Sequence, residues 1–108
     1  MKEHLGRCAE HLRTAVRHLA SSSSTPQKKL TDMYEDTRFE SISENDFLEG
    51  SLRDDYLAIR ASLTKGSGPQ AVANIAAMSD DQAYQVIRQI CWLSESVAYA
   101  LGRESNSA

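Results

Sequence analysis

The sequence predicts an all-α protein, a small bundle of four to five helices in which the first and last helices are long. Apolar residues recur at spacings of three and four in several segments, as on one face of an amphipathic helix. Breaks containing serine, glycine or proline separate these segments, and no stretch shows the sustained alternation of a strand. The 108 residues fit a single domain, and 41% hydrophobic with 25% charged residues is typical of a folded chain.

The first helix is predicted over residues 2–20, where apolar positions form one stripe: Leu5, Cys8, Leu12, Ala15 and Leu19. The serines at 21–24 have no apolar face to bury, which predicts a Ser-rich loop over residues 21–29. Thr25 offers an N-cap oxygen and Pro26 a first-turn residue for a second helix that runs to about Arg38.

Further start and stop signals divide the rest of the chain. Ser43 and Asp46 predict a short turn that ends at Gly50, and Ser51 with Asp54 forms a capping box for a helix that ends near Gly66. Pro69 predicts a short helix. Ser79 with Gln82 caps the last long helix, expected over about 80–102, with residues 103–108 as a disordered tail beyond Gly102.

Three histidines, His4, His11 and His18, lie seven residues apart on the flank of the first stripe. Adjacent ones are about 10.5 Å apart along the helix axis, whereas a zinc ion holds its ligand nitrogens at about 2.1 Å. We therefore expect neither a metal site nor a cofactor. One alternative is a dimer seam along the Leu5, Leu12 and Leu19 helix, which protonation of the histidines would weaken towards pH 5–6.

The last predicted helix carries side chains of an unexpected kind opposite its apolar stripe. At about 100° per residue, five residues gather on the face that ought to be polar: Tyr84, Arg88, Trp92, Glu95 and Tyr99. Tryptophan, tyrosine and arginine dominate the energetics of protein interfaces. The sequence leaves two alternatives open, a helix enclosed on all sides in its own bundle and a helix that presents a docking surface.

No catalytic constellation emerges, so we expect no enzyme. The spacing from Arg13 to His18 resembles the arginine-four-residues-histidine motif of HEPN ribonucleases, which implies a helical dimer acting on RNA through these two residues. The segment 94–105 is similar to the first helix and turn of a helix-turn-helix, but only six residues remain after Gly102 for the recognition helix.

Charge is unevenly placed along the chain. Residues 1–29 carry a net +4, residues 30–64 a net −6 and residues 65–108 a net −1. The net charge of −3 disfavours nucleic acid as a partner, and the basic first helix is the one candidate surface for it.

The combined features predict a cytoplasmic, homodimeric regulator that acts by protein contact. No apolar run approaches the roughly 20 residues of a membrane helix, and charges at the N-terminus argue against a signal peptide. Bacterial anti-activators offer an analogy at the level of the fold, with a transcriptional regulator as one kind of partner. The interface residues are expected on the aromatic side of the last helix and along Leu5, Leu12 and Leu19.

Overall fold

The computed structural model describes residues 2–21, 24–37, 39, 42, 50–64 and 70–106. This part of the chain contains five α-helices and no strand: α1 (Lys2–Ser21), α2 (Pro26–Asp36), α3 (Gly50–Thr64), α4 (Gln70–Ala76) and α5 (Asp80–Asn106). The all-α prediction is confirmed, and the first and last helices are the two longest.

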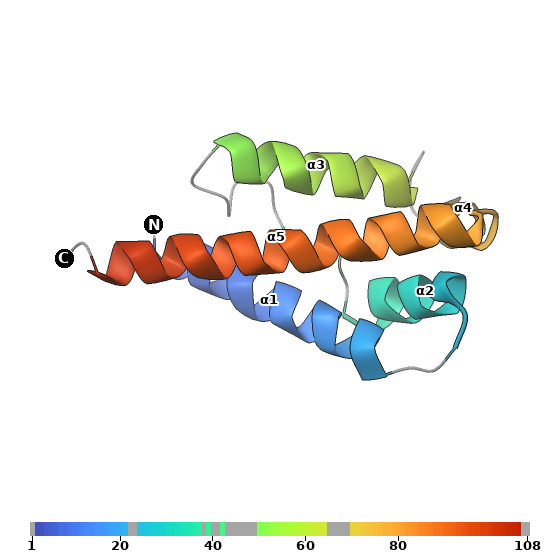
Figure 1. Cartoon of the computed structure of the whole chain (residues 1–108), viewed down its shortest axis with the longest axis horizontal. Helices are drawn as coiled ribbons and strands as arrows, with labels where there is room; N and C mark the ends of the chain where they lie inside the picture. Colours follow the sequence, from blue (N-terminus) through green and yellow to red (C-terminus); the bar gives the residue numbers. More distant parts are fainter. Residues whose placement is uncertain are drawn as a thin grey trace.

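Helix α5 is the element around which the others are arranged. Its 27 residues rise about 40 Å, close to the longest dimension of the molecule, 45 Å. Helices α1, α2 and α3 all contact it. In Figure 1, α3 lies along one side of α5, and α1 and α2 lie along the other. With overall dimensions of 45 × 28 × 21 Å, the molecule is broad and flat.

The core lies between α5 and its three neighbours. Helix α5 contributes Ala83, Val86, Ile90, Leu93 and Val97, all buried, with the half-buried Ile87 and Leu101 packed at the margin of the core. The stripe predicted for the first helix faces this core: Cys8, Leu12, Ala15 and Leu19 are buried. The side chains of His4 and Leu5 lie outside the described residues.

Two predicted caps are present. The Thr25 Oγ1 accepts a hydrogen bond from the backbone N–H of Lys28 at 3.3 Å, with Pro26 in the first turn of α2. At α5, the backbone N–H of Ser79 donates to Gln82 Oε1 at 3.0 Å, and Ser79 Oγ accepts from the N–H of Gln82 at 3.2 Å. Each cap needs residues only three apart, which is why the pattern could predict it.

Several predicted boundaries are wrong. Helix α2 already includes Pro26 and the three residues after it, so the loop between α1 and α2 is shorter than 21–29. Helix α2 ends at Asp36, where Thr37 is the C-cap. Helix α3 begins at Gly50, one residue before Ser51, so Ser51 lies inside the helix and does not act as its N-cap. The predicted turn at Ser43 and the glycine at 66 lie outside the described residues.

The end of the last helix differs most from the sequence prediction. Helix α5 continues through Gly102 to Asn106, so residues 103–106, predicted as disordered, are helical. A glycine inside a helix costs only about 0.5–1 kcal/mol, and no proline follows to stop the helix. The continuous helix also removes the turn that a helix-turn-helix requires at this point.

Side-chain hydrogen bonds fix the shorter helices. The Asn74 amide of α4 donates to the carbonyls of Ser62 and Leu63 at 2.8 and 2.9 Å, near the C-terminal end of α3. Gln27 of α2 donates to the Met78 carbonyl at 2.9 Å and to Asp80 Oδ1 at 2.8 Å, beside the start of α5. The contacts to backbone oxygens satisfy carbonyls near helix ends, where a helix cannot supply every partner itself.

A buried hydroxyl offers a test of the packing. Tyr56 of α3 is fully buried, stacks at a tilt on Phe39 with ring centroids 5.9 Å apart, and donates its hydroxyl to the carbonyl of Ile42. We expect Tyr56→Phe to lower the free energy of unfolding by about 1–3 kcal/mol, because a buried carbonyl loses its donor. Urea titration followed by circular dichroism measures this change.

The matched control is Tyr84→Phe, since Tyr84 is an exposed tyrosine of the same chain. It should change the free energy of unfolding by less than about 0.5 kcal/mol. Equal effects from the two substitutions would contradict the role of the Tyr56 hydroxyl.

Candidate functional site

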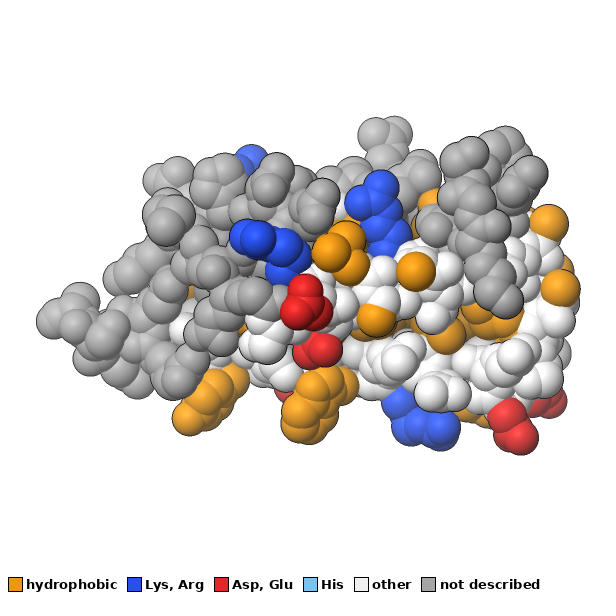
Figure 2. Space-filling model, turned by 90° about the horizontal axis from the view of Figure 1, so that it is seen from above, with side chains coloured by type: hydrophobic (Ala, Val, Ile, Leu, Met, Phe, Trp, Pro, Cys, Tyr) orange, Lys and Arg blue, Asp and Glu red, His pale blue; other side chains and the backbone are white. Residues whose placement is uncertain are grey.

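The candidate site is the side of α5 that its neighbours leave uncovered. We call it the aromatic face and define it by Tyr84, Arg88, Trp92, Glu95 and Tyr99, all of them exposed. It exists because α1, α2 and α3 pack against the opposite, apolar stripe of α5. Figure 2 shows hydrophobic side chains projecting along one edge of the molecule, with basic and acidic side chains along the same edge.

The exposure of the aromatics excludes one of the two alternatives that the sequence left open, a helix enclosed on all sides in its own bundle. Trp92 is 64% exposed, Tyr99 69% and Tyr84 45%, and they are the exposed large hydrophobic residues of the described chain. These side chains do not belong to the chain's own core. An aromatic row exposed on one helix is typical of a contact surface, because large exposed apolar patches in soluble proteins usually bind something.

A hollow of about 390 Å³ adjoins the aromatic face. Trp92 and Arg88 line it from α5, and Asp55, Ala58 and Ile59 line it from α3. The sequence predicted the α5 residues but missed the α3 residues, since nothing in the pattern of one helix shows which neighbour lies beside it. A second hollow, of about 330 Å³, continues past Gln85 and Gln89 towards α4.

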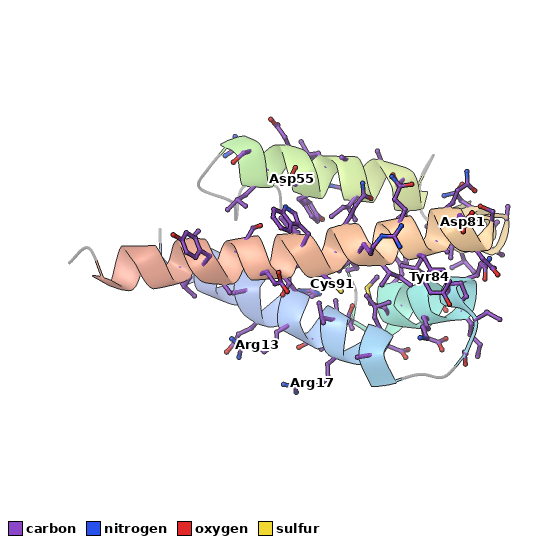
Figure 3. All side chains as sticks on the ribbon, in the orientation of Figure 1. Arg13, Arg17, Asp55, Asp81, Tyr84 and Cys91 are labelled. Atoms are coloured by element: carbon purple, nitrogen blue, oxygen red, sulfur yellow. The ribbon has the colours of Figure 1, made fainter. Side chains whose placement is uncertain are left out.

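Cys91 lies at the margin of the aromatic face, between α5 and α1 in the view of Figure 3. Its pKa is raised above the ordinary value of a thiol, first by partial burial and second by the negative charge of Glu95. The thiol form is therefore favoured at neutral pH, and the site has no activated nucleophile at this position. No disulfide joins Cys91 to Cys8, which is buried.

The second predicted surface is corrected by the structure. Leu12 is fully buried and Leu19 is 4% exposed, so both belong to the core that α1 forms with the rest of the chain. They cannot at the same time contact another molecule. The reason is that the apolar stripe of α1 is covered by α5 and α2 of its own chain.

His11 and His18 border this core as predicted, and one of them has a defined contact. His11 is half-buried and its Nε2 hydrogen bonds to the carbonyl of Thr37, at the C-terminal end of α2. That carbonyl belongs to the end of a helix, where a donor is stabilising. His18 is half-buried as well. In the part of the chain that the structure describes, no three His, Cys, Asp or Glu residues are placed to hold a metal ion.

The pair that resembles the ribonuclease motif lies within the continuous helix α1. Arg13 is exposed and His18 is half-buried. Residues five apart on a helix point about 140° apart, so these two side chains do not converge on one point of the surface. Figure 3 shows Arg13 and Arg17 on the side of α1 that is turned away from α5.

The chain matches no protein-family model, no curated protein and no solved structure. None of the described helices is long and apolar enough to cross a membrane.

The thiol of Cys91 provides a test of the electrostatics of this face. Glu95→Gln removes the negative charge that opposes ionisation, so the pKa of Cys91 should fall and its thiolate fraction at pH 8 should rise. We expect faster alkylation by iodoacetamide, measured by mass spectrometry at several pH values. The pKa should stay raised to some extent, because partial burial is the larger cause.

Glu10→Gln on α1 is the control, since Glu10 is exposed and does not contribute to the pKa of Cys91. An unchanged alkylation rate in Glu95→Gln would show that Glu95 does not influence the thiol.

Proposed function

We propose that this chain is a small protein-binding regulator that acts by contact, through the aromatic face of α5. The observation that carries the proposal is the exposure of Tyr84, Trp92 and Tyr99 on one side of one helix. Burying such side chains on a partner supplies large apolar area at a small cost in conformational entropy. Arg88 and Glu95 between them supply the charges that select a partner.

The kind of regulator follows from what the face can do. A face with no activated thiol and exposed aromatics suits an inhibitor, anti-activator or adaptor that occupies a surface of a larger regulatory protein, such as a transcriptional regulator. The same properties suit a homodimer.

A nucleic-acid role has one observation in its favour, the exposure of Arg13 and Arg17 one turn apart on α1. The exposed Glu10 on the same helix and the net charge of −3 weaken it. Retention on DNA that depends on salt and falls when both arginines are neutralised would mark that role.

The proposed function is tested by crosslinking in cells from the centre of the aromatic face. A photoreactive phenylalanine analogue placed at position 92 should form adducts with a second, larger protein, because Trp92 is 64% exposed and central. The same analogue at position 13, on the side of α1 turned away from α5, is the matched control. Mass spectrometry identifies the adducts.

Tyr99→Ala in the same background should reduce the adducts at position 92 about tenfold or more, as expected for an aromatic anchor. Circular dichroism should show an intact fold, since exposed positions change stability by less than about 0.5 kcal/mol. Equal adducts from positions 92 and 13 would contradict the proposal. Adducts with a second copy alone would contradict a regulator of another protein and leave the aromatic face as a contact surface.

A further inference from the structure

The residues of the aromatic face follow an order that is symmetric about its centre. The centre falls between Cys91 and Trp92. Tyr84 and Tyr99 lie at equal distances on either side of it, about 11 Å along the axis, and Arg88 and Glu95 lie at equal distances of about 5 Å. Aromatic residues therefore mirror each other, and a positive charge mirrors a negative one.

The side of α5 on which these mirrored pairs lie also faces away from the core. At about 100° per residue, the direction midway between each mirrored pair lies roughly opposite to Val86, Ile90 and Val97. A two-fold axis level with this centre would therefore bring a second α5 against the exposed side and leave the core contacts untouched.

We propose that the aromatic face binds a second copy of this chain, with the two α5 helices antiparallel across a two-fold axis level with the point between Cys91 and Trp92. This inference rests on the proposed function, in which the face is a contact surface, and it names a second copy of the chain as a further occupant of that face. A two-fold contact must be complementary to itself, and the order of charges and aromatics on α5 meets that condition.

The pairing across the axis is specific. Arg88 of each chain lies level with Glu95 of the second copy, so two ion pairs form at once. Both copies of Trp92 lie on the same flank of the contact, within about 2 Å of each other along the axis, and pack together. A parallel contact in register would instead set Arg88 against Arg88 and Glu95 against Glu95, which repel.

The area available is consistent with a dimer of moderate affinity. With the observed exposures, the three aromatics offer on the order of 350 Å² per chain, against roughly 800 Å² per partner in a standard interface. The remainder must come from the broad face of the flat molecule along which α5 runs. We expect dissociation in the micromolar range. A target that binds the same face competes with the second copy, so dimerisation sets how much of the face is free.

The test uses charge reversal and analytical ultracentrifugation of the full chain. The wild-type chain should show a mass that rises with concentration towards twice 12.0 kDa. Arg88→Glu should weaken the dimer about tenfold or more, because it sets two carboxylates against each other at both ion-pair positions, and Glu95→Arg should do the same with two guanidinium groups. Arg13→Glu on α1 is the control and should leave the dimer unchanged.

The decisive sample is an equimolar mixture of Arg88→Glu and Glu95→Arg. In the heterodimer, the carboxylate at position 88 of the first variant faces the guanidinium at position 95 of the second, and Glu95 of the first faces Arg88 of the second. Opposite charges are therefore restored at both places, and a heterodimer should form with an affinity near that of the wild-type dimer. The double variant should likewise recover the homodimer. Recovery in the mixture also shows that both single variants fold.

Two results would overturn the dimer. One is a wild-type chain that stays monomeric at every concentration, and the other is a dimer that neither single reversal weakens or that the mixture fails to restore. A monomeric chain that still forms position 92 adducts with another protein would refute the dimer alone and leave the proposed function standing. A dimer that forms as described without such adducts would refute only the regulatory role.

Discussion

Burial of one apolar stripe of α5 is the interaction on which the rest of the structure depends. An isolated helix in water has little stability of its own, and helices as short as α2 and α4 are unstable by themselves. Each fully buried aliphatic side chain of α5 contributes about 1.5–3 kcal/mol, and Ile90, Leu93 and Val97 are all completely enclosed. Helices α1, α2 and α3 are held in one molecule because each covers part of this stripe.

The same constraint produces the aromatic face. Three helices that share one stripe approach α5 from the same half of its circumference, so the other half stays in solvent over the part of α5 whose side chains the structure describes. The hollow between Trp92 and Ala58 is a consequence, because α3 lies beside the face and does not cover it. The position of the candidate site is thus set by the core, although none of its residues belongs to the core.

The sequence predicted what depends on residues close together in the chain. The Thr25 cap, the Ser79 and Gln82 pair and the apolar stripe of α1 all follow from spacings of three or four, and all are present. Two boundaries predicted from glycines are wrong, since α3 begins at Gly50 and α5 passes through Gly102. Glycine lowers helix stability only slightly, and no neighbouring atom lies close to Gly102 to add a further constraint.

Contacts between residues far apart in the chain could not be predicted from the sequence. His11 meets the carbonyl of Thr37 from 26 positions away, and Gln27 reaches Asp80 from 53. The periodicity of α1 showed that His11 flanks the core but not which helix end it would meet. For the same reason Leu12 and Leu19 were predicted as a contact surface: an apolar stripe looks identical whether its partner is the same chain or another, and the chain's own helices cover both residues here.

This ambiguity shows why the aromatic face is more informative than any other exposed surface. An apolar residue on the inner stripe is explained once the fold is known, whereas Trp92 and Tyr99 stay largely in solvent. Exposed aromatics lower solubility, so a chain with no contact to make would do better with polar residues at these positions. Arg88 and Glu95 between these aromatics reduce non-specific association. A surface that buries the aromatics must also pair both charges, because burying an unpaired charge is costly. A second α5 in antiparallel orientation is such a surface, since the symmetric placement of Arg88 and Glu95 supplies the match from within the same sequence.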